Sequence, residues 1–284
     1  MFYNFRFTKI PWFFFEKLKI NRKRLFTLAQ YRKVAIKFNK RFYNNIKEDF
    51  VSSKSDYDNI YSDLINNGFT KIATMKDKFV SELLSNIDSK FDLNFSKKIK
   101  KSQIELVSRE QLEKEKFIFK FLKNSKILLP IQKYFKSKAR YFGCSIIGSN
   151  ITSDLSGSQN FHLDNIEESA FRIMVLMTDV EIVNGPTLVI NSKDTERIIK
   201  NNNYMNRRDY ALMTDENLGI ENEKINKFCG KKGDVFLLDT CNCFHAGGRV
   251  LEGQRIVLMA TIARGLSSNF RWMYNGKYSY GAQL

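Results

Sequence analysis

The scarcity of several residue types narrows the class of protein to which this chain can belong. The 284 residues include only three prolines and four cysteines, too few for a proline-rich linker or a disulfide framework. No run reaches the length of about 18 apolar residues that a membrane-spanning helix needs. The apolar run at 12–15 is too short for a secretory signal peptide. We therefore expect a cytoplasmic protein in a reducing environment.

Positive charge and apolar side chains, by contrast, are abundant. Hydrophobic residues make up 43% of the chain and include 25 phenylalanines, which is typical of a folded globular protein. The net charge of +17 is unevenly distributed: residues 1–140 hold 32 basic and 14 acidic residues, whereas residues 141–284 hold 15 and 16. This asymmetry predicts that the neutral half contains the reactive site and that the basic half binds an anionic partner.

The pattern of residue types along the chain changes near Tyr141. Residues 1–55 mix aromatic and basic residues at helical spacing and predict a basic, aromatic-rich helical extension. The rest, 56–284, is expected to be one domain, helical over 56–140 apart from a short strand at 69–73. Its core at 141–265 predicts a sandwich or barrel of short strands. The strands are expected at 141–149, 160–164, 170–180, 186–190, 234–239, 244–250 and 254–263.

A polar, helix-like insertion at 193–230 interrupts these strands. It contains Tyr204, Arg207 and Arg208. We expect it to be a lid that closes over the site and excludes water. The alternative is a surface excursion with no role.

Histidine is the scarcest of the charge-bearing residues, since His162 and His245 are the only two. Residues i and i+2 of a strand face the same side, so His162 and Asp164 are expected to point together into the barrel. With His245 they make a set of two histidines and one carboxylate. That set is typical of non-haem Fe(II) oxygenases, because three protein ligands leave open positions on the metal. A lone histidine would be better explained as a core residue.

A second signal follows ten residues after His245. Arg255 lies in the apolar run expected to form the last strand. A buried arginine needs an anionic partner, because an unpaired buried charge is destabilising. The distal carboxylate of an α-keto acid such as 2-oxoglutarate would supply one through a bidentate contact.

Taken in order, these pieces resemble a known family from about Tyr61 to Arg264. The chain is similar to the phytanoyl-CoA dioxygenase-like branch of the Fe(II)/2-oxoglutarate-dependent dioxygenases. The matching pieces are LINNGF at 64–69, FHLD at 161–164, NGPTLVI at 184–190, the Gly-Asp-Val turn at 233–235 and the His245-to-Arg255 spacing.

The resemblance implies an α+β protein with a double-stranded β-helix core, also called a jelly roll or cupin-like fold, flanked by helices. It implies Fe(II) as cofactor, with 2-oxoglutarate and O2 as co-substrates. The reaction would hydroxylate an unactivated C–H bond and release succinate and CO2.

The resemblance also assigns roles to individual residues. The two histidines and Asp164 would hold the iron, and no catalytic residue is expected beyond these ligands. Arg255 would bind 2-oxoglutarate, with Thr187 and Gln159 as further polar contacts. Val257 departs from the family, which often has Ser or Thr two residues after the arginine. Asp164 itself argues for hydroxylation, since halogenating relatives lack that carboxylate.

Two other interpretations of the site residues are open at this point. Cys241 and Cys243 share strand parity with His245, and thiolates favour zinc. Small buried cysteines are the alternative explanation. The competing function is therefore a non-catalytic or zinc-binding basic β-barrel that binds anionic surfaces.

The expected partner is a small or anionic substrate, whether acyl, phosphorylated, sugar or lipid-linked. The basic residues of 1–140 also suggest peripheral contact with an anionic membrane or a phosphate-rich ligand. Helices that pack their aromatic faces on the barrel would account for the same pattern. No nucleic-acid-binding module is recognisable, so no sequence-specific nucleic acid is expected.

Overall fold

The computed structural model describes residues 54, 56–95, 103–151, 155, 157–164, 170–201 and 218–264. The basic extension predicted for 1–55 lies almost wholly outside these residues, so its helical character stays a prediction. None of the helices in the described ranges has both the length and the apolar character of a transmembrane segment.

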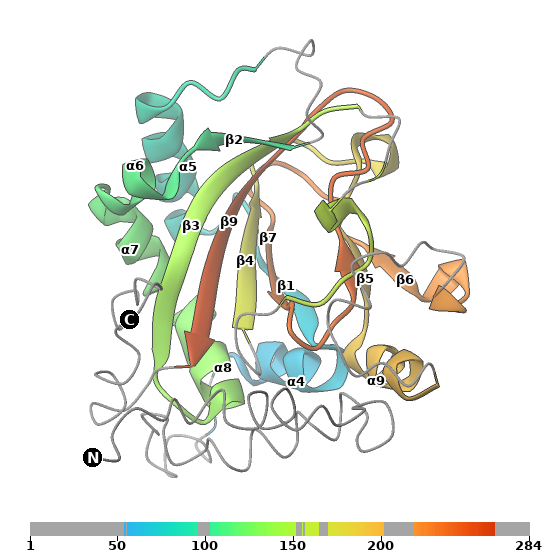
Figure 1. The fold of residues 1–284 in the computed structure, drawn as a ribbon. Helices are drawn as coiled ribbons and strands as arrows, with labels where there is room; N and C mark the ends of the chain where they lie inside the picture. Colours follow the sequence, from blue (N-terminus) through green and yellow to red (C-terminus); the bar gives the residue numbers. More distant parts are fainter. Residues whose placement is uncertain are drawn as a thin grey trace, which may run out of the picture.

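A six-stranded antiparallel sheet dominates the structure (Figure 1). Its strand order is β1-β7-β4-β9-β3-β2, so segments far apart in the sequence pair directly. Ser149 at the end of β3, for example, lies opposite Arg255 at the start of β9. The strands are β1 (Phe69–Ala73), β2 (Gln103–Val107), β3 (Ala139–Ser149), β4 (Ala170–Leu176), β7 (Val235–Asp239) and β9 (Arg255–Arg264).

A smaller, three-stranded sheet lies against the large one and has the order β6-β5-β8. Its strands are β5 (Leu188–Ile190), β6 (Ile225–Lys227) and β8 (His245–Ala246). A single bridge from His162 to His245 adds one more pairing beside β8. Met174, Val257 and Phe236 of the large sheet share one apolar cluster with Val189 of the small sheet. The two sheets therefore enclose a common core, and the fold is the predicted α+β double-stranded β-helix.

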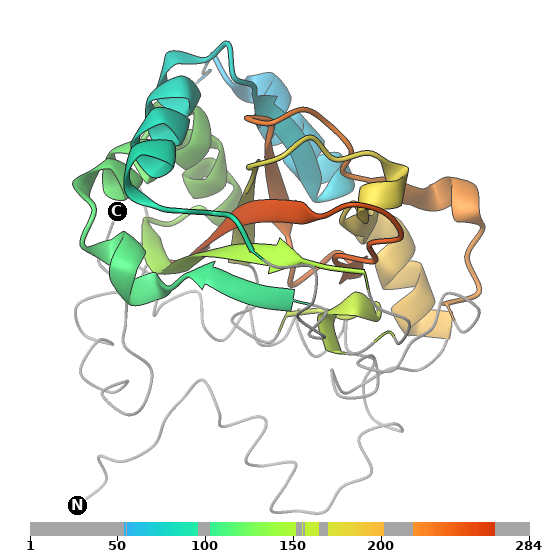
Figure 2. The same cartoon turned by 90° about the horizontal axis from the view of Figure 1, so that it is seen from above.

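Helices cover the outer face of the large sheet, as the two orthogonal views show (Figures 1 and 2). They form a second apolar cluster with the sheet residues that point outward. The helices of this layer are α4 (Asp58–Asn67), α5 (Lys78–Lys90), α6 (Arg109–Glu113), α7 (Lys116–Leu122) and α8 (Ser125–Phe135). Helix α9 (Ser192–Asn201) packs instead with the small sheet, because its Ile198 and Ile199 share a cluster with Ile190 and Ala246. The short turns are η3 (Gly157–Gln159), η4 (Ile182–Asn184) and η7 (Asn222–Lys224).

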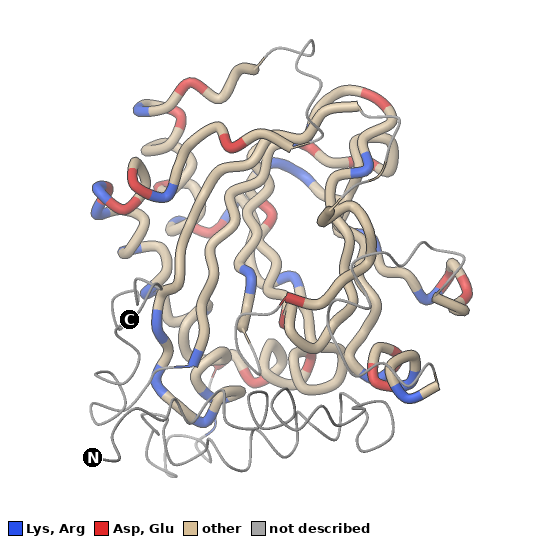
Figure 3. The backbone as a smooth tube through the Cα atoms, viewed as in Figure 1, with Lys and Arg blue, Asp and Glu red and all other residues tan. Residues whose placement is uncertain are grey.

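Strand β4 illustrates how alternation assigns its residues to the two faces. Phe171 and Ile173 belong to the cluster under the helices, whereas Met174 and Leu176 belong to the cluster between the sheets. Arg172 has the same parity as Met174, so its side chain lies on the inner face. β4 is otherwise apolar, and Figure 3 shows few charged positions along the strands of the large sheet.

Six of the seven strands expected in the second half are found, with shifted ends. The seventh, at 160–164, is not a strand and contains only isolated bridge pairing, as between His162 and His245. The strand predicted at 69–73 is also confirmed as β1. Two strands were missed, β2 because its short run QIELV lies next to Lys-rich sequence and β6 because it has only three residues. The edge strand β2 lies in the Lys-rich region expected to be helical, and β6 lies in the insertion predicted at 193–230. The predicted strand 244–250 is shorter, because pairing stops before two consecutive glycines.

Gly68 ends α4 in a conformation that other residues rarely adopt. Its φ is +83°, and a Cβ built there would lie 2.4 Å from the Sγ atom of Cys243. Gly68→Ala is therefore expected to lower the free energy of unfolding by about 2 to 4 kcal/mol, from left-handed strain plus overpacking. Guanidinium denaturation followed by circular dichroism measures this loss.

Gly219 provides a matched control for this variant. Its φ is +58°, but a Cβ at this position meets no atom within 4 Å. Gly219→Ala should show only the strain of the left-handed conformation, about 1 kcal/mol. Equal losses for the two variants would refute the proposed contact with Cys243.

Candidate metal centre

The two histidines come together through backbone pairing of their strands. The N–H of His162 donates to the carbonyl of His245 at 3.0 Å, and the N–H of His245 donates to that of His162 at 3.1 Å. The two imidazole rings lie on the same side of this bridge, with centroids 4.3 Å apart. The 82 residues between them thus form a loop closed by one pair of hydrogen bonds.

Asp164 completes a cluster of three ligand-type side chains. One donor atom from each of His162, Asp164 and His245 lies within 4.8 Å of the others. Oδ1 of Asp164 is 3.8 Å from Nε2 of His162 and 4.0 Å from Nε2 of His245. A single carboxylate oxygen therefore faces both imidazoles. The donor set of two nitrogens and one oxygen suits a divalent first-row metal.

Hydrogen bonds to the backbone orient both imidazoles toward this point. Nδ1 of His162 lies 2.8 Å from the carbonyl oxygen of Asn160, and Nδ1 of His245 lies 3.1 Å from that of Cys243. A carbonyl only accepts, so Nδ1 carries the proton in each ring. Each Nε2 is left with a lone pair directed at the cluster, the arrangement usual for metal-binding histidines.

Asp164 is held by groups on two neighbouring segments. Its Oδ2 accepts a hydrogen bond from Nε of Arg172 on β4 at 3.1 Å. Its backbone N–H donates to the carbonyl of Thr240 at 2.9 Å, and the Thr240 hydroxyl donates to the carbonyl of Ala170 on β4 at 3.3 Å. Burial alone would raise the pKa of Asp164. Arg172, the histidines and Thr240 together lower it well below the usual range, so the carboxylate is ionised at neutral pH.

His245 is the more buried of the two histidines, with 8% of its surface exposed. Burial and the neighbouring His162 lower the pKa of His245 to about 4. The imidazole is therefore neutral at pH 7, the protonation state that a metal ligand requires.

Arg255 and Thr187 are brought into direct contact. Nη2 of Arg255 donates to Oγ1 of Thr187 at 2.6 Å. Only 5% of Arg255 is exposed, and burial lowers the pKa of its guanidinium to about 10, which leaves it charged at pH 7. No carboxylate pairs with Arg255 in the described part of the chain, and its Nε has no hydrogen-bond partner there. Among the described residues, therefore, no anion accompanies this buried cation.

Gln159 and the glycines after β8 lie on the same side of the site as Arg255. Nε2 of Gln159 donates to the carbonyl of Gly248 at 3.0 Å. A Cβ at Gly248 would lie 3.4 Å from Nη1 of Arg255, and one at Gly247 would lie 4.0 Å from it. Gly247 is two positions after His245, and two residues span about 7 Å at most. The guanidinium is therefore on the order of 10 Å from the backbone of His245.

The cysteines do not form a thiolate site with His245. The His-Asp-His set is the one ligand cluster found among the described residues. Cys241 and Cys243 are buried in separate apolar clusters, and Sγ of Cys243 lies 3.4 Å from the carbonyl oxygen of Asn67. The zinc interpretation is therefore not supported, and both cysteines are small core residues.

The region proposed as a lid is only partly described. Its start is α9 and its end contains β6, which is part of the small sheet. Tyr204, Arg207 and Arg208 lie outside the described residues, so the lid stays a prediction.

The sequence interpretation missed two residues that contact the cluster, Arg172 and Thr240. Arg172 could have been found, because it is the one charged residue in the apolar run AFRIMVL of β4. The contact between Arg172 and Asp164 could not have been found from the sequence, because it depends on how β4 lies beside the preceding segment.

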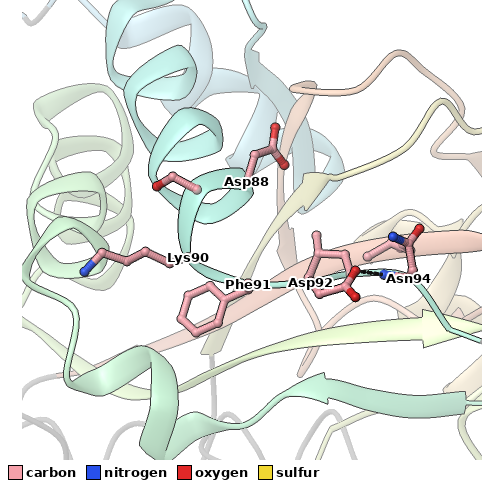
Figure 4. A pocket seen from close by; sticks show the side chains of 8 residues that line it. Asp88, Lys90, Phe91, Asp92 and Asn94 are labelled. Carbon is pink, nitrogen blue, oxygen red and sulfur yellow. Dashed lines mark hydrogen bonds between the residues drawn. The ribbon is translucent and has the colours of Figure 1, made fainter.

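A surface hollow of about 540 Å³ lies elsewhere, at the end of α5 (Figure 4). It is lined by 88–94 and by Ile256, whose side chain belongs to the outer cluster under the helices. Its polar groups are already engaged, since Asp88 pairs with Lys232 and Asp92 accepts from the N–H of Asn94. The hollow takes no part in the His-Asp-His site.

Comparisons with known proteins bear on the fold alone. No family model matches the sequence, and the search of curated proteins gave no match either. HygX from Streptomyces hygroscopicus, with nickel, 2-oxoglutarate and hygromycin B bound, aligns at a TM-score of 0.50 and 13% identity. The alignment covers 81% of this chain and 98% of HygX.

Two further structures are similar at a slightly lower level. The non-heme α-ketoglutarate-dependent epimerase SnoN from nogalamycin biosynthesis has a TM-score of 0.49 and 12% identity, covering 80% of this chain and 95% of SnoN. EctD from S. alaskensis in its apoform has a TM-score of 0.49 and 14% identity, covering 81% and 84%. Identities this low leave substrate and reaction to be argued from the site itself.

Proposed function

We propose that this chain, which has the double-stranded β-helix fold also found in HygX, is an Fe(II)- and 2-oxoglutarate-dependent hydroxylase. In this reaction 2-oxoglutarate, O2 and a substrate C–H bond become succinate, CO2 and a hydroxylated product. One oxygen atom enters succinate and the other enters the product.

The observation that carries the proposal is the buried guanidinium of Arg255, which pairs with no carboxylate in the described part of the chain and lies near the glycines that follow His245. A metal cluster alone fits many hydrolytic and redox proteins. A buried arginine with no carboxylate needs an anionic ligand, and the hydroxyl of Thr187 adds a second polar contact at the same place. A dicarboxylate that reaches from the metal to Arg255 satisfies both requirements.

The residues then take distinct roles. His162, Asp164 and His245 would hold the iron on one face and leave the other positions open. Arg255 and Thr187 would fix the distal carboxylate of 2-oxoglutarate, and Gln159, whose Nε2 donates to the carbonyl of Gly248, would be a further polar contact. Iron and 2-oxoglutarate, when bound, supply the chemistry that activates O2. With both imidazoles engaged at Nε2, no histidine is left as a general base.

Anaerobic loading tests this proposal. Protein mixed with Fe(II) and 2-oxoglutarate under nitrogen should develop the weak visible charge-transfer band of a chelated keto acid. The matched control is Fe(II) with succinate, which lacks the keto group and should give no band. The proposal would be refuted if 2-oxoglutarate gave no band and no succinate formed in air.

The proposal also covers the substrate and the basic residues of 1–140. The primary substrate is a small or anionic molecule, and residues 1–140 would contribute contacts to a phosphate-rich ligand or an anionic membrane. In the described part of this region several lysines already pair with acidic residues, as Lys126 does with Asp77 and Lys133 with Asp58. Co-sedimentation of full-length protein with anionic vesicles would test membrane contact, with neutral vesicles as the control.

A further inference from the structure

Arg172 places a partly exposed positive charge at the metal cluster. Its Nε lies 3.1 Å from Oδ2 of Asp164, and 30% of its side chain is exposed. Its strand neighbours Phe171 and Ile173 are fully buried. The inner face of β4 therefore reaches solvent at the position of Arg172.

The contact with Asp164 uses only part of the guanidinium. Among the described residues, Arg172 makes one hydrogen bond, from Nε, and its two terminal nitrogens make none. An arginine has five N–H donors in a planar fork, and the fork matches a carboxylate or phosphate. The terminal donors are accessible from solvent and adjacent to a metal ligand.

Arg172 and Arg255 lie on different sides of the cluster. Arg172 is opposite Thr261 on β9, six residues along that strand from Arg255. At about 3.3 Å per residue the two backbone positions are roughly 20 Å apart. The side chain of Arg255 reaches the glycines after His245, whereas that of Arg172 reaches Asp164. The metal cluster lies between a buried arginine and a solvent-facing one.

We propose that the terminal nitrogens of Arg172 form a subsite for an oxyanion of the primary substrate, a carboxylate or a phosphate, beside the metal. The proposal rests on the proposed function, because it assigns 2-oxoglutarate to Arg255 and leaves Arg172 for the molecule that is oxidised. Asp164 neutralises part of the charge, and an incoming oxyanion would complete the pairing. Recognition of this kind selects substrates that carry an anionic group close to the C–H bond to be hydroxylated.

The test uses protein loaded with Mn(II) and 2-oxoglutarate under nitrogen. Mn(II) is paramagnetic and speeds the relaxation of nuclei bound nearby, so inorganic phosphate is followed by 31P NMR and labelled acetate by 13C NMR. The wild type should give a saturable increase in relaxation for at least one probe. Arg172→Gln should weaken that binding roughly 10- to 100-fold, and Arg172→Lys should retain part of it because the charge is kept.

Separate measurements distinguish the outcomes. Free Mn(II), measured by electron paramagnetic resonance, shows whether each variant is loaded, and calorimetry gives the 2-oxoglutarate affinity. Equal probe relaxation in the wild type and Arg172→Gln would mean that the anion binds the metal directly, which overturns the subsite. Loss of 2-oxoglutarate affinity in Arg172→Gln, with probe binding unchanged, would assign Arg172 to the keto acid and also overturn it. A wild type that binds neither metal nor 2-oxoglutarate would refute the proposed function instead.

Discussion

Asp164→Ala is expected to lower the affinity for ferrous iron by at least about 100-fold, more than alanine at either histidine. The substitution removes the only carboxylate in the cluster. It also leaves the guanidinium of Arg172, now without its partner, facing a divalent cation at a few ångströms, where repulsion adds to the lost ligand. Competition with a chelator under nitrogen measures the change in affinity.

The fold should survive this substitution. The backbone N–H of Asp164 donates to the carbonyl of Thr240 whatever side chain is present. Asp179→Ala is the matched control, because Asp179 is a half-exposed carboxylate that pairs with Lys231. The double variant Asp164→Ala/Arg172→Gln should recover part of the lost affinity, because it removes the repulsion. Iron binding by Asp164→Ala within threefold of the wild type would contradict the assignment of Asp164 as a ligand.

Arg255→Met is expected to weaken 2-oxoglutarate binding by about 100-fold or more while metal affinity stays within threefold of the wild type. A charged contact between a buried guanidinium and a carboxylate contributes about 3 kcal/mol, and methionine cannot replace it. Arg255 contacts Thr187 and lies near Gly248, and among the described residues it makes no hydrogen bond to a metal ligand, so the ligands keep their positions. Isothermal titration with Ni(II), and then with 2-oxoglutarate, separates the two affinities.

The same variant should change stability in the opposite direction. In the ligand-free protein Arg255 is a buried charge without a carboxylate partner, and an apolar side chain of similar length should raise the free energy of unfolding by about 1 to 2 kcal/mol. 2-Oxoglutarate should raise the melting temperature of the metal-loaded wild type but not of the metal-loaded variant. Arg109→Met is the control, since Arg109 is partly exposed and pairs with Glu113. Equal losses of metal and 2-oxoglutarate affinity in Arg255→Met would contradict its role.

Much of the architecture could be predicted because strand periodicity and turn residues are local signals. The runs that became β3, β4, β7 and β9 are long and apolar, and all four were expected from the sequence. The strands that were missed, β2 and β6, depend on a neighbour. Glu105 in β2 pairs with Ile147 at the edge of the sheet, and Asn226 in β6 pairs with Val189. The alternation in QIELV covers only four residues, and β6 has three residues in all, so both segments are too short for a pattern to separate a strand from a helix or loop.

The candidate site shows the same division between local and long-range information. The i, i+2 spacing of His162 and Asp164 could be interpreted from the sequence, because alternation along a strand is a property of the backbone. The contact between Arg255 and Thr187, 68 residues apart, depends on the packing of the two sheets. The salt bridge between Arg172 and Asp164 likewise depends on where β4 lies. The assignment of these residues to iron and 2-oxoglutarate stays a prediction that the variants above address.

The sequence by itself determined which donors this protein has: two histidines, an aspartate two residues after the first, and an arginine ten residues after the second. Tertiary structure alone decided how those donors are used. Backbone carbonyls take the Nδ1 protons and leave each Nε2 free, and Arg172 occupies one carboxylate oxygen while the other faces the histidines. Packing buries Arg255 and lowers its pKa only to about 10, so it stays charged although no described carboxylate pairs with it. These choices depend on distances between atoms that are remote in the chain, and only the packing of one sheet on the other fixes those distances.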